Sequence, residues 1–371
     1  MLYVIVKVTE ICIFKCKYCY FFCSKDNSFL QHPPFMDFDT VKCLANFIKQ
    51  GVMDLKLKHI HICIHGGEPL LYGTDNIDKF CSHILDTISP YAEICFSIQT
   101  NGYLISDIWL DLFEKYNMFV GVSLDGPSEY HDKFRVDAVG RKTHPVVENN
   151  LKKLLKRKRL YDKKNIGILT VIDPTHSPEK LYKYFVHKLE VQVMDFLLPD
   201  HHYDHKPPYL PESYGNFLIE LYKQWMKDDD PDIRIKFFEA VLASILGYKS
   251  TLIGIGPFVP NRLPVITVSS DGSLRAVDEL CKAVPRLISK NVYLDNITCK
   301  KFITSSVFKD IADAQMNLPD ECINCTHNNT CSAGYILNRY SKKNFFNNPS
   351  IYCAGLKKFY DHVVEHVKTH Q

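Results

Sequence analysis

Short apolar runs alternate with longer amphipathic stretches along the first half of the chain. The apolar runs have the length and β-branched content of buried strands, and the stretches between them repeat apolar residues at helical spacing. Strands that alternate with helices form parallel sheets with right-handed crossovers, so the pattern predicts an α/β fold. The predicted strands are 3–8, 59–64, 94–99, 119–124, 166–172 and 193–198, and the predicted helices lie near 40–50, 75–88, 106–117, 145–160 and 177–190.

Length and charge narrow the class of protein. The chain has 371 residues, of which 46% are apolar, so it can bury a large core and divide into a main and a smaller domain. The net charge of +3 predicts no nucleic-acid partner, and a solvated helix face explains the basic run over 152–164. We expect a cytoplasmic protein without a membrane partner, because no apolar stretch is long enough to span a bilayer and the N-terminus enters a strand pattern without a signal peptide.

Three cysteines follow the first predicted strand at spacings of four and three residues, namely Cys12, Cys16 and Cys19. Three thiolates can hold three irons of a 4Fe-4S cube and leave the fourth iron open to chelate a small molecule. A zinc site would need a fourth protein ligand, for which Cys23 is the nearest candidate. The 14 cysteines of the chain also indicate a reducing compartment and metal ligation.

The cysteine spacing, with an aromatic residue before the third cysteine, resembles the signature of radical S-adenosylmethionine enzymes. The resemblance implies a partial (β/α)6 barrel, in which ligands bind at the carboxyl ends of the strands. It also implies that the open iron binds the amino and carboxylate groups of S-adenosylmethionine. An electron from a donor such as flavodoxin or ferredoxin then generates a 5'-deoxyadenosyl radical, which the protein must orient and shield.

A glycine-rich loop follows the second predicted strand and contains Gly66, Gly67, Glu68 and Pro69. Paired glycines let the backbone approach a ligand closely, and a carboxylate such as that of Glu68 can pair with an ammonium group. The loop resembles the GGEP element of the same family, which contacts the amino group of the cofactor. Taken alone, two glycines and a proline would indicate an ordinary turn.

Polar residues also follow the third and fourth predicted strands. Gln99 and Asn101 follow the third, Ser123 ends the fourth, and Arg135 lies beyond it. The resemblance implies that Ser123 contacts the ribose and Arg135 the carboxylate of the cofactor, and a guanidinium fork suits a carboxylate. We predict that all four bind the cofactor. Ordinary turn chemistry would equally explain Thr100, Asn101, Asp125 and Gly126.

A second cysteine cluster lies near the C-terminus and can close a metal site completely. It resembles the SPASM extension of peptide-modifying radical enzymes, which implies a second, auxiliary 4Fe-4S cluster, although zinc would compete if this motif stood alone. We therefore predict a radical SAM domain over 1–205, a helical bridge over 206–262 and a SPASM-like domain with a C-terminal helix over 263–371. The four predicted ligands are Cys322, Cys325, Cys331 and Cys353.

The chain departs from the full SPASM pattern. Val277 and Tyr335 stand where that pattern has two cysteines of an inner cluster, so we expect this inner cluster to be absent. The remaining cysteines follow no ligand spacing, and we expect them to be small buried apolar residues. They are Cys43, Cys63, Cys81, Cys95, Cys281 and Cys299.

Several short segments resemble those of maturases that form cyclophanes in ribosomally made precursor peptides. They are 197–200, 207–208, 271–272, 277–278, 331–335, 339–341 and 348–350. This resemblance implies a precursor peptide as the substrate and a bond between an aromatic ring and a side-chain β-carbon. Such a reaction must release one proton and one electron, for which we predict Asp278 as the base and the auxiliary cluster as the electron acceptor. A helix cap or an exposed acid would explain Asp278 equally well.

Two other functions stay open. Another radical modification, such as formylglycine formation on a sulfatase, a thioether or an epimer, would share the fold and the first cluster. The missing inner cluster argues mildly against the sulfatase type. A non-catalytic zinc or iron-sulfur binding module would leave the recurrence of polar loops at successive strand ends unexplained.

Overall fold

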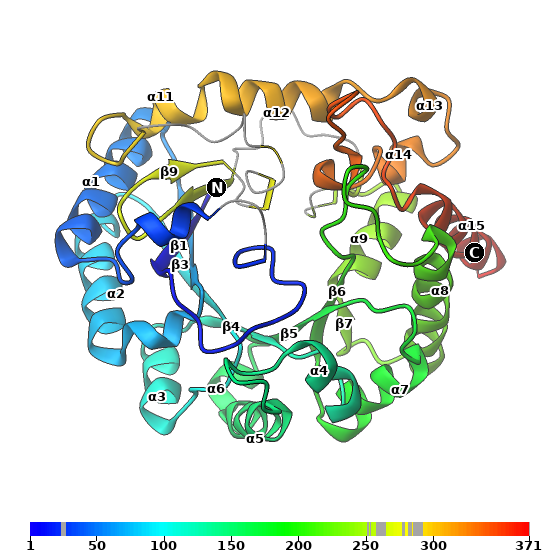
Figure 1. Cartoon of the computed structure of the whole chain (residues 1–371), viewed down its shortest axis with the longest axis horizontal. Helices are drawn as coiled ribbons and strands as arrows, with labels where there is room; N and C mark the ends of the chain where they lie inside the picture. The colour runs from blue at the N-terminus through cyan, green and yellow to red at the C-terminus, as the bar shows by residue number, and fades with distance from the viewer. Residues whose placement is uncertain are drawn as a thin grey trace. The chain divides into compact units, whose positions relative to one another are not determined.

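The structure is a computed structural model of the whole chain (Figure 1). It describes residues 1–23, 27–250, 252, 254–256, 265–276, 279–280, 284 and 292–370.

Six strands match the six predicted apolar runs, with ends shifted by two residues or fewer. Three further strands are only two to four residues long, which is too short to produce a visible alternation in the sequence. The strands are β1 (Leu2–Thr9), β2 (His59–Gly66), β3 (Glu93–Thr100), β4 (Phe119–Ser123), β5 (Ile166–Val171), β6 (Val193–Leu197), β7 (Arg234–Ile235), β8 (Val265–Val268) and β9 (Leu274–Arg275).

Helical segments follow each of the first six strands, as the sequence predicted. Those in the first half are η1 (Ser28–Gln31), α1 (Phe38–Leu55), η2 (Pro69–Tyr72), α2 (Thr74–Ile88), α3 (Asp107–Lys115), α4 (Ser128–Phe134), α5 (His144–Leu155), α6 (Lys158–Tyr161), α7 (Pro178–Tyr182) and η3 (Lys183–Lys188). Those in the second half are α8 (Pro211–Asp228), α9 (Lys236–Ile245), α11 (Cys299–Ile303), α12 (Ser306–Met316), α13 (Asp320–Ile323), α14 (Asn328–Cys331), η5 (Ile336–Arg339) and α15 (Cys353–Thr369).

The chain forms two compact units that interleave along the sequence. The first contains Met1–Leu124, His131–Gly167 and Asn261–Asp310, and the second contains Asp125–Tyr130, Ile168–Pro260 and Ile311–Gln371. The functional boundaries after residues 205 and 262 stay a prediction.

The first unit is built on a largely parallel sheet in the order β4-β3-β2-β1-β8-β9. β1 pairs in parallel with β2 on one side and with β8 on the other, and only β9 runs antiparallel. Leu2, Val4, Val6 and Val8 of β1 are fully buried. The burial of each such side chain is worth about 1.5–3 kcal/mol, so this face of β1 anchors the sheet.

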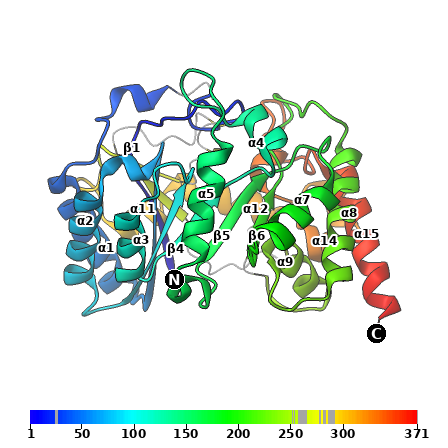
Figure 2. The same ribbon diagram turned by 90° about the horizontal axis from the view of Figure 1, so that it is seen from below.

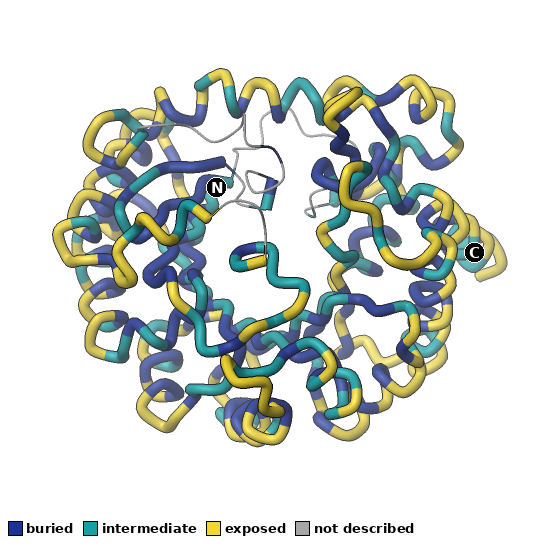
Figure 3. Tube along the Cα trace, viewed as in Figure 1, coloured by how far each residue is buried: buried dark blue, intermediate teal, exposed yellow. Residues whose placement is uncertain are grey.

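Helices α1, α2 and α3 lie side by side along the sheet of the first unit (Figures 1 and 2). Each helix buries one face made mostly of apolar residues and exposes the opposite face, which gives the alternating colours in Figure 3. The helix α1 begins after Asp37, whose carboxylate accepts a hydrogen bond from the Thr40 N–H group at 2.7 Å. Such a cap satisfies one of the unpaired N–H groups at the helix start.

In the second unit, α8 and α15 pack against each other (Figures 1 and 2). Their closest approach involves Gly215 of α8 and Gly355 of α15. A Cβ atom on Gly215 would lie 2.3 Å from the Gly355 carbonyl oxygen, and one on Gly355 would lie 2.0 Å from the Pro211 carbonyl oxygen. The backbones can therefore meet only because both residues lack a side chain. This contact fixes the start of α15, where Cys353 lies.

In the part of the chain that the structure describes, no helix is both long enough and apolar enough to cross a membrane.

Candidate active site and candidate metal centre

The first three predicted cluster ligands lie in the loop that follows β1. The loop folds tightly, because the Cys19 N–H group donates to the Cys16 carbonyl at 3.1 Å. The thiols of Cys12 and Cys19 accept hydrogen bonds from backbone N–H groups two and three residues further on, at 3.3 and 3.4 Å. None of the three cysteines is in a disulfide. Backbone donors to sulfur favour the thiolate, which offsets part of the effect of burial on these thiols.

Arg135 lies against this loop although it is more than a hundred residues away in sequence. The Lys15 N–H group donates to the Val136 carbonyl at 2.8 Å, and this pairing brings the neighbouring Arg135 to the loop. One guanidinium nitrogen of Arg135 lies 3.9 Å from the Cys16 sulfur, and the guanidinium carbon lies 5.3 Å from the centre of the Tyr18 ring. A buried positive charge beside a thiolate stabilises it. The predicted contact of Arg135 with the cofactor carboxylate stays a prediction.

Burial raises the pKa of the Cys12 thiol to about 12, and it also raises the pKa of Cys19. These thiols hold their protons when no metal is bound. A metal centre would replace the protons, so its assembly would release them.

The paired glycines pack against the backbone that leads into the cysteine loop. A Cβ atom on Gly66 would lie 2.2 Å from the Thr9 carbonyl oxygen, and one on Gly67 would lie 2.2 Å from the Ile11 carbonyl oxygen. Gly66 also has a φ of 139°, which L side chains rarely adopt. The sequence predicted that a ligand approaches the backbone closely at these glycines. The structure shows that the backbone of Thr9 and Ile11 does so. Pro69 then begins η2, where a missing N–H group costs nothing.

Glu68 is fully buried and links two of the predicted loops. One carboxylate oxygen accepts hydrogen bonds from the Leu70 N–H group at 3.1 Å and from the Thr100 hydroxyl at 2.6 Å. The other accepts from the Asn101 N–H group at 2.8 Å. Glu68 therefore braces the loop after β2 against the end of β3. Its predicted contact with the amino group of the cofactor stays a prediction.

The residues predicted at the ends of β3 and β4 contact each other or the cysteine loop. The Gln99 amide donates to the Ser123 hydroxyl at 3.0 Å. A Cβ atom on Gly121 would lie 2.1 Å from the Gln99 side-chain oxygen, so a larger residue here would displace this amide. The Asn101 amide nitrogen lies 3.9 Å from the Cys12 sulfur. The structure thus brings Gln99, Ser123 and Asn101 to one end of the sheet, and the role of Gly121 was missed in the sequence.

The environment of Glu68 makes the stability of the first unit depend on pH. Burial raises the pKa of the Glu68 carboxyl from 4.5 to about 7. Because the folded chain then binds a proton that the unfolded chain releases, the free energy of unfolding falls as the pH rises through this window, by at most about 3 kcal/mol. Glu68→Gln lacks this titration. Urea unfolding at about pH 5 and about pH 8 should show wild type losing stability relative to the variant as the pH rises, and parallel profiles would contradict the shift.

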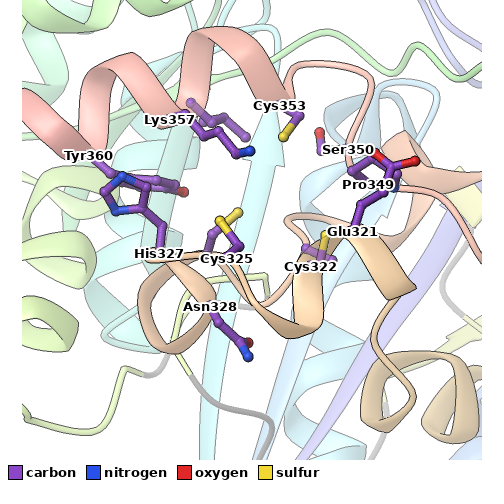
Figure 4. A pocket seen from close by; sticks show the side chains of 13 residues that line it. Glu321, Cys322, Cys325, His327, Asn328, Pro349, Ser350, Cys353, Lys357 and Tyr360 are labelled. Atoms are coloured by element: carbon purple, nitrogen blue, oxygen red, sulfur yellow. The ribbon is translucent and has the colours of Figure 1, made fainter.

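The second group of predicted ligands lines one pocket in the second unit (Figure 4). The pocket has about 430 Å³ of empty space, which includes open solvent. Figure 4 shows the sulfur atoms of Cys322, Cys325 and Cys353 directed into the same space. Cys331 also lines the pocket. The structure therefore brings together four cysteines from two separate segments of the chain.

Three of these four cysteines lie in helices, and Cys325 lies in the connection between α13 and α14. Cys322 lies in α13, Cys331 ends α14, and Cys353 begins α15. The turn after α14 uses three successive residues with positive φ, from Ser332 to Gly334. Burial raises the pKa of Cys322 and Cys353, and it raises that of Cys331 to about 12. As at the first site, a metal centre would have to displace these protons.

A single zinc ion and an iron-sulfur cluster require different arrangements of their thiolate ligands. Four thiolates on a tetrahedral zinc ion lie about 3.8 Å apart, since each Zn–S bond is about 2.3 Å. Within the described residues, no three histidine, cysteine or acidic side chains converge on one such ion. By number and ligand type the two sets suit 4Fe-4S clusters, with three thiols in the first and four in the second.

The other sequence predictions have mixed outcomes. Asp278, the predicted base, lies outside the described residues, as do Val277 and Cys281. Tyr335 precedes η5, and its phenol replaces the thiolate that an inner cluster would need. Cys63, Cys81 and Cys299 are buried, as predicted. The prediction was wrong for Cys43, which is exposed on α1, and for Cys95, which is only half-buried.

A comparison with models of protein families matches residues 6–184 to the radical SAM superfamily. Residues 6–184 form a radical SAM domain. A domain of this kind uses S-adenosylmethionine with a 4Fe-4S cluster, and Cys12, Cys16 and Cys19 are the residues that would hold this cluster. The predicted family and α/β fold class are therefore confirmed, and the chain is an oxidoreductase.

Relatives and solved structures resemble this chain over nearly its whole length. A cysteine-type anaerobic sulfatase-maturating enzyme of Clostridium novyi is 27% identical over 361 residues, which cover 94% of this chain and 91% of the relative. A serine-type enzyme of Bacteroides thetaiotaomicron is 24% identical over 393 residues, covering 99% and 90%. The structure of native anSMEcpe with bound AdoMet and Kp18Cys peptide has a TM-score of 0.85 at 24% identity, covering 99% of this chain and 98% of that chain. This likeness shows the shared fold.

Proposed function

We propose that this enzyme oxidises a side chain of a peptide or protein substrate, and that the product is a formylglycine aldehyde made from cysteine or serine. The observation that carries the proposal is the similarity to both cysteine-type and serine-type sulfatase-maturating enzymes over at least nine-tenths of this chain. The comparisons do not support our cyclophane prediction and favour the alternative of formylglycine formation.

The chemistry needs two electron-transfer sites, and the chain offers two cysteine sets. S-adenosylmethionine, when bound at the first cluster, supplies a carbon radical that removes a hydrogen atom from a C–H bond. Cys12, Cys16 and Cys19 would hold that cluster, and Arg135 would stabilise the Cys16 thiolate. The second pocket would hold a cluster able to accept an electron from the substrate. A reduced flavodoxin or ferredoxin would supply the electron that starts the reaction.

Serine and cysteine side chains both lose two hydrogens in this oxidation. A serine side chain loses two hydrogens and becomes an aldehyde directly. A cysteine side chain loses two hydrogens to give a thioaldehyde, which water converts to the aldehyde with release of hydrogen sulfide. In each case one hydrogen leaves as an atom, and the other leaves as a proton and an electron. Asp278 is our proposed acceptor of this proton, and its role rests on the sequence alone.

A second candidate is a carbon-carbon cross-link in a precursor peptide. Tyr335 favours it, because this residue stands where the full SPASM pattern has a cysteine ligand of the inner cluster. The expected absence of that cluster argues mildly against the sulfatase type. A cross-link also removes two hydrogens from the peptide, but it leaves no aldehyde and retains all the sulfur.

The two candidates are separable with reconstituted enzyme and mass spectrometry. One substrate is a peptide that spans the modification site of a cysteine-type sulfatase, with serine and alanine versions at the modified position. The other is any short peptide encoded beside the gene. We expect a product of the cysteine and serine peptides that reacts with a hydrazide, and none from the alanine peptide. A product that lacks two hydrogens, keeps its sulfur and does not react with the hydrazide would contradict the aldehyde and support the cross-link.

A further inference from the structure

A hairpin from a distant part of the chain pairs with the cysteine loop of the first unit. The Lys15 and Lys17 N–H groups donate to the carbonyls of Val136 and Phe134, at 2.8 and 3.1 Å. Val136 in turn forms an antiparallel bridge with Lys142. Three short segments of the chain therefore lie side by side, namely 14–17, 134–137 and 141–142.

Side chains alternate between the two sides of these paired segments. Cys16 and Arg135 share the inner side, where a guanidinium nitrogen of the buried Arg135 lies 3.9 Å from the Cys16 sulfur. Lys15 and Lys17 flank Cys16 in the sequence, and both are exposed on the other side. Lys142 is in register with Lys15 across the hairpin and is exposed as well. One side therefore carries a cluster ligand, and the other carries lysines in contact with solvent.

The outer side is basic and has apolar residues at its centre. Val136 and Phe134 are half-buried there. The exposed Lys133 also reaches this side, because its ammonium nitrogen lies 4.9 Å from the centre of the Phe134 ring. We call this surface the lysine face, and its charged residues are Lys15, Lys17, Lys133 and Lys142.

The acidic residues of the hairpin and of α4 beside it already have partners. One Asp137 oxygen accepts from the Val139 and Arg141 N–H groups at 3.0 and 2.8 Å, and the other accepts from the Arg141 guanidinium at 2.6 Å. Asp132 accepts from two backbone N–H groups at the start of α5, at 2.9 and 3.0 Å. Since Arg141 balances Asp137, only Asp132 offsets the four lysines. The lysine face is therefore a local positive surface on a chain whose net charge is only +3.

We propose that the lysine face docks an acidic protein that donates one electron to the first cluster, and that the electron enters through the cysteine loop. This inference rests on the proposed function, in which a reduced flavodoxin or ferredoxin starts the reaction. One electron leaves the donor and one enters the cluster, and no bond forms or breaks. Neighbouring Cα atoms are about 3.8 Å apart, so a protein that contacts Lys15 and Lys17 lies close to the ligand Cys16.

The chemistry of an electron donor matches the composition of this surface. A donor must bind, transfer its electron and leave in every turnover, and such encounters use small interfaces. Complementary charges increase the rate of encounter by about ten- to a thousandfold, and salt weakens the effect. The half-buried Val136 and Phe134 offer apolar contact at the centre of the charged rim.

The test compares charge reversal on the lysine face with charge reversal elsewhere on the first unit. The double variant Lys133→Glu/Lys142→Glu changes the lysine face at positions that do not adjoin a cysteine. Lys153→Glu/Lys156→Glu is the matched control, because both lysines are exposed and lie at the other end of α5. This helix has 12 residues and is about 18 Å long. Both double variants change the net charge by the same amount.

Two measurements are made on each full-length holoenzyme without a peptide substrate. Calorimetry measures the binding of oxidised flavodoxin, and chromatography measures the rate at which limiting reduced flavodoxin supports deoxyadenosine formation. We expect the lysine-face variant to bind flavodoxin about tenfold more weakly at low salt and to form deoxyadenosine correspondingly more slowly. The control should change by less than about twofold, and the difference should shrink at an ionic strength of about 0.5 M.

Excess dithionite separates docking from damage to the cluster. A small reductant needs no docking surface, so iron content and deoxyadenosine yield with dithionite should match wild type in both double variants. If the lysine-face variant loses iron, Lys142→Gln is the milder change, and it should weaken flavodoxin binding while the iron is retained. Unchanged flavodoxin binding in an iron-replete lysine-face variant would overturn the inference, and so would equal weakening in the control.

The remaining outcomes separate the donor from the substrate and the product. Weaker binding of the peptide substrate with unchanged binding of flavodoxin would assign the lysine face to the substrate and overturn the inference. A specific loss of flavodoxin binding, together with a product other than an aldehyde, would leave this inference standing and refute only the proposed product.

Discussion

Cys16→Ala should abolish the reductive cleavage of S-adenosylmethionine. Cys16 contributes one of three thiolates, and a cube that loses one of them has too few protein ligands to persist in the loop after β1. One guanidinium nitrogen of Arg135 lies 3.9 Å from the Cys16 sulfur, so the substitution also removes this contact. The measurement is chromatography of deoxyadenosine after anaerobic reconstitution and reduction with dithionite.

Cys23→Ala is the matched control for this loss. Cys23 lies in the same loop, is exposed, and donates through its thiol to the Cys16 carbonyl at 3.4 Å. With three ligands and an open iron, Cys23→Ala should keep deoxyadenosine formation near the wild-type level. An equal loss of deoxyadenosine formation in both variants would indicate that four cysteines bind the cluster. No iron would then be open to bind the cofactor.

The fold was largely predictable because its periodic signals are local. Leu2, Val4, Val6 and Val8 alternate within β1, and the helices between the strands carry clear apolar faces. The strands β8 and β9 were not predictable, because four and two residues carry no period of their own. β8 is defined by its pairing with β1, some 260 residues earlier in the chain, and no sequence window contains that information.

The sequence predicted which residues belong to the candidate sites better than it predicted their contacts. The cysteine spacings predicted seven ligands, and the structure places these cysteines in two groups. The sequence did not show that Gly66 and Gly67 pack on the carbonyls of Thr9 and Ile11. It also did not show that the Glu68 carboxylate is occupied by three donors of the protein. The roles of these three residues depend on which backbone groups pack against them, and the fold alone determines those groups.

Arg339 illustrates a different limit. In the sequence it belonged to one of the segments, 339–341, that resembled cyclophane-forming maturases, and arginine is usually exposed. Its burial follows from η5 being enclosed in the second unit, where Ile336 and Leu337 are also buried. The environment of this charged side chain therefore depends on the folded structure, and the sequence alone does not show it.

Cys353→Ala should remove the second cluster and the modified product while leaving cofactor cleavage intact. Cys353 begins α15, whose position is fixed by the Gly215–Gly355 contact, so the helix should stay in place when the thiol is lost. Wild type should contain about eight irons per chain and the variant about four. Deoxyadenosine should still form, because the first site lies in the other unit, but the peptide should not be oxidised without an acceptor for its electron.

Cys43→Ala is the control for Cys353→Ala, because Cys43 is an exposed cysteine on α1 and lies in neither site. Its iron content and product yield should equal those of wild type. Iron analysis, deoxyadenosine chromatography and mass spectrometry of the peptide are performed on the same preparations. Wild-type iron near twelve would show that an inner cluster assembles in spite of Tyr335. Full product from Cys353→Ala with four irons would show that the first site alone completes the oxidation and that another group accepts the electron.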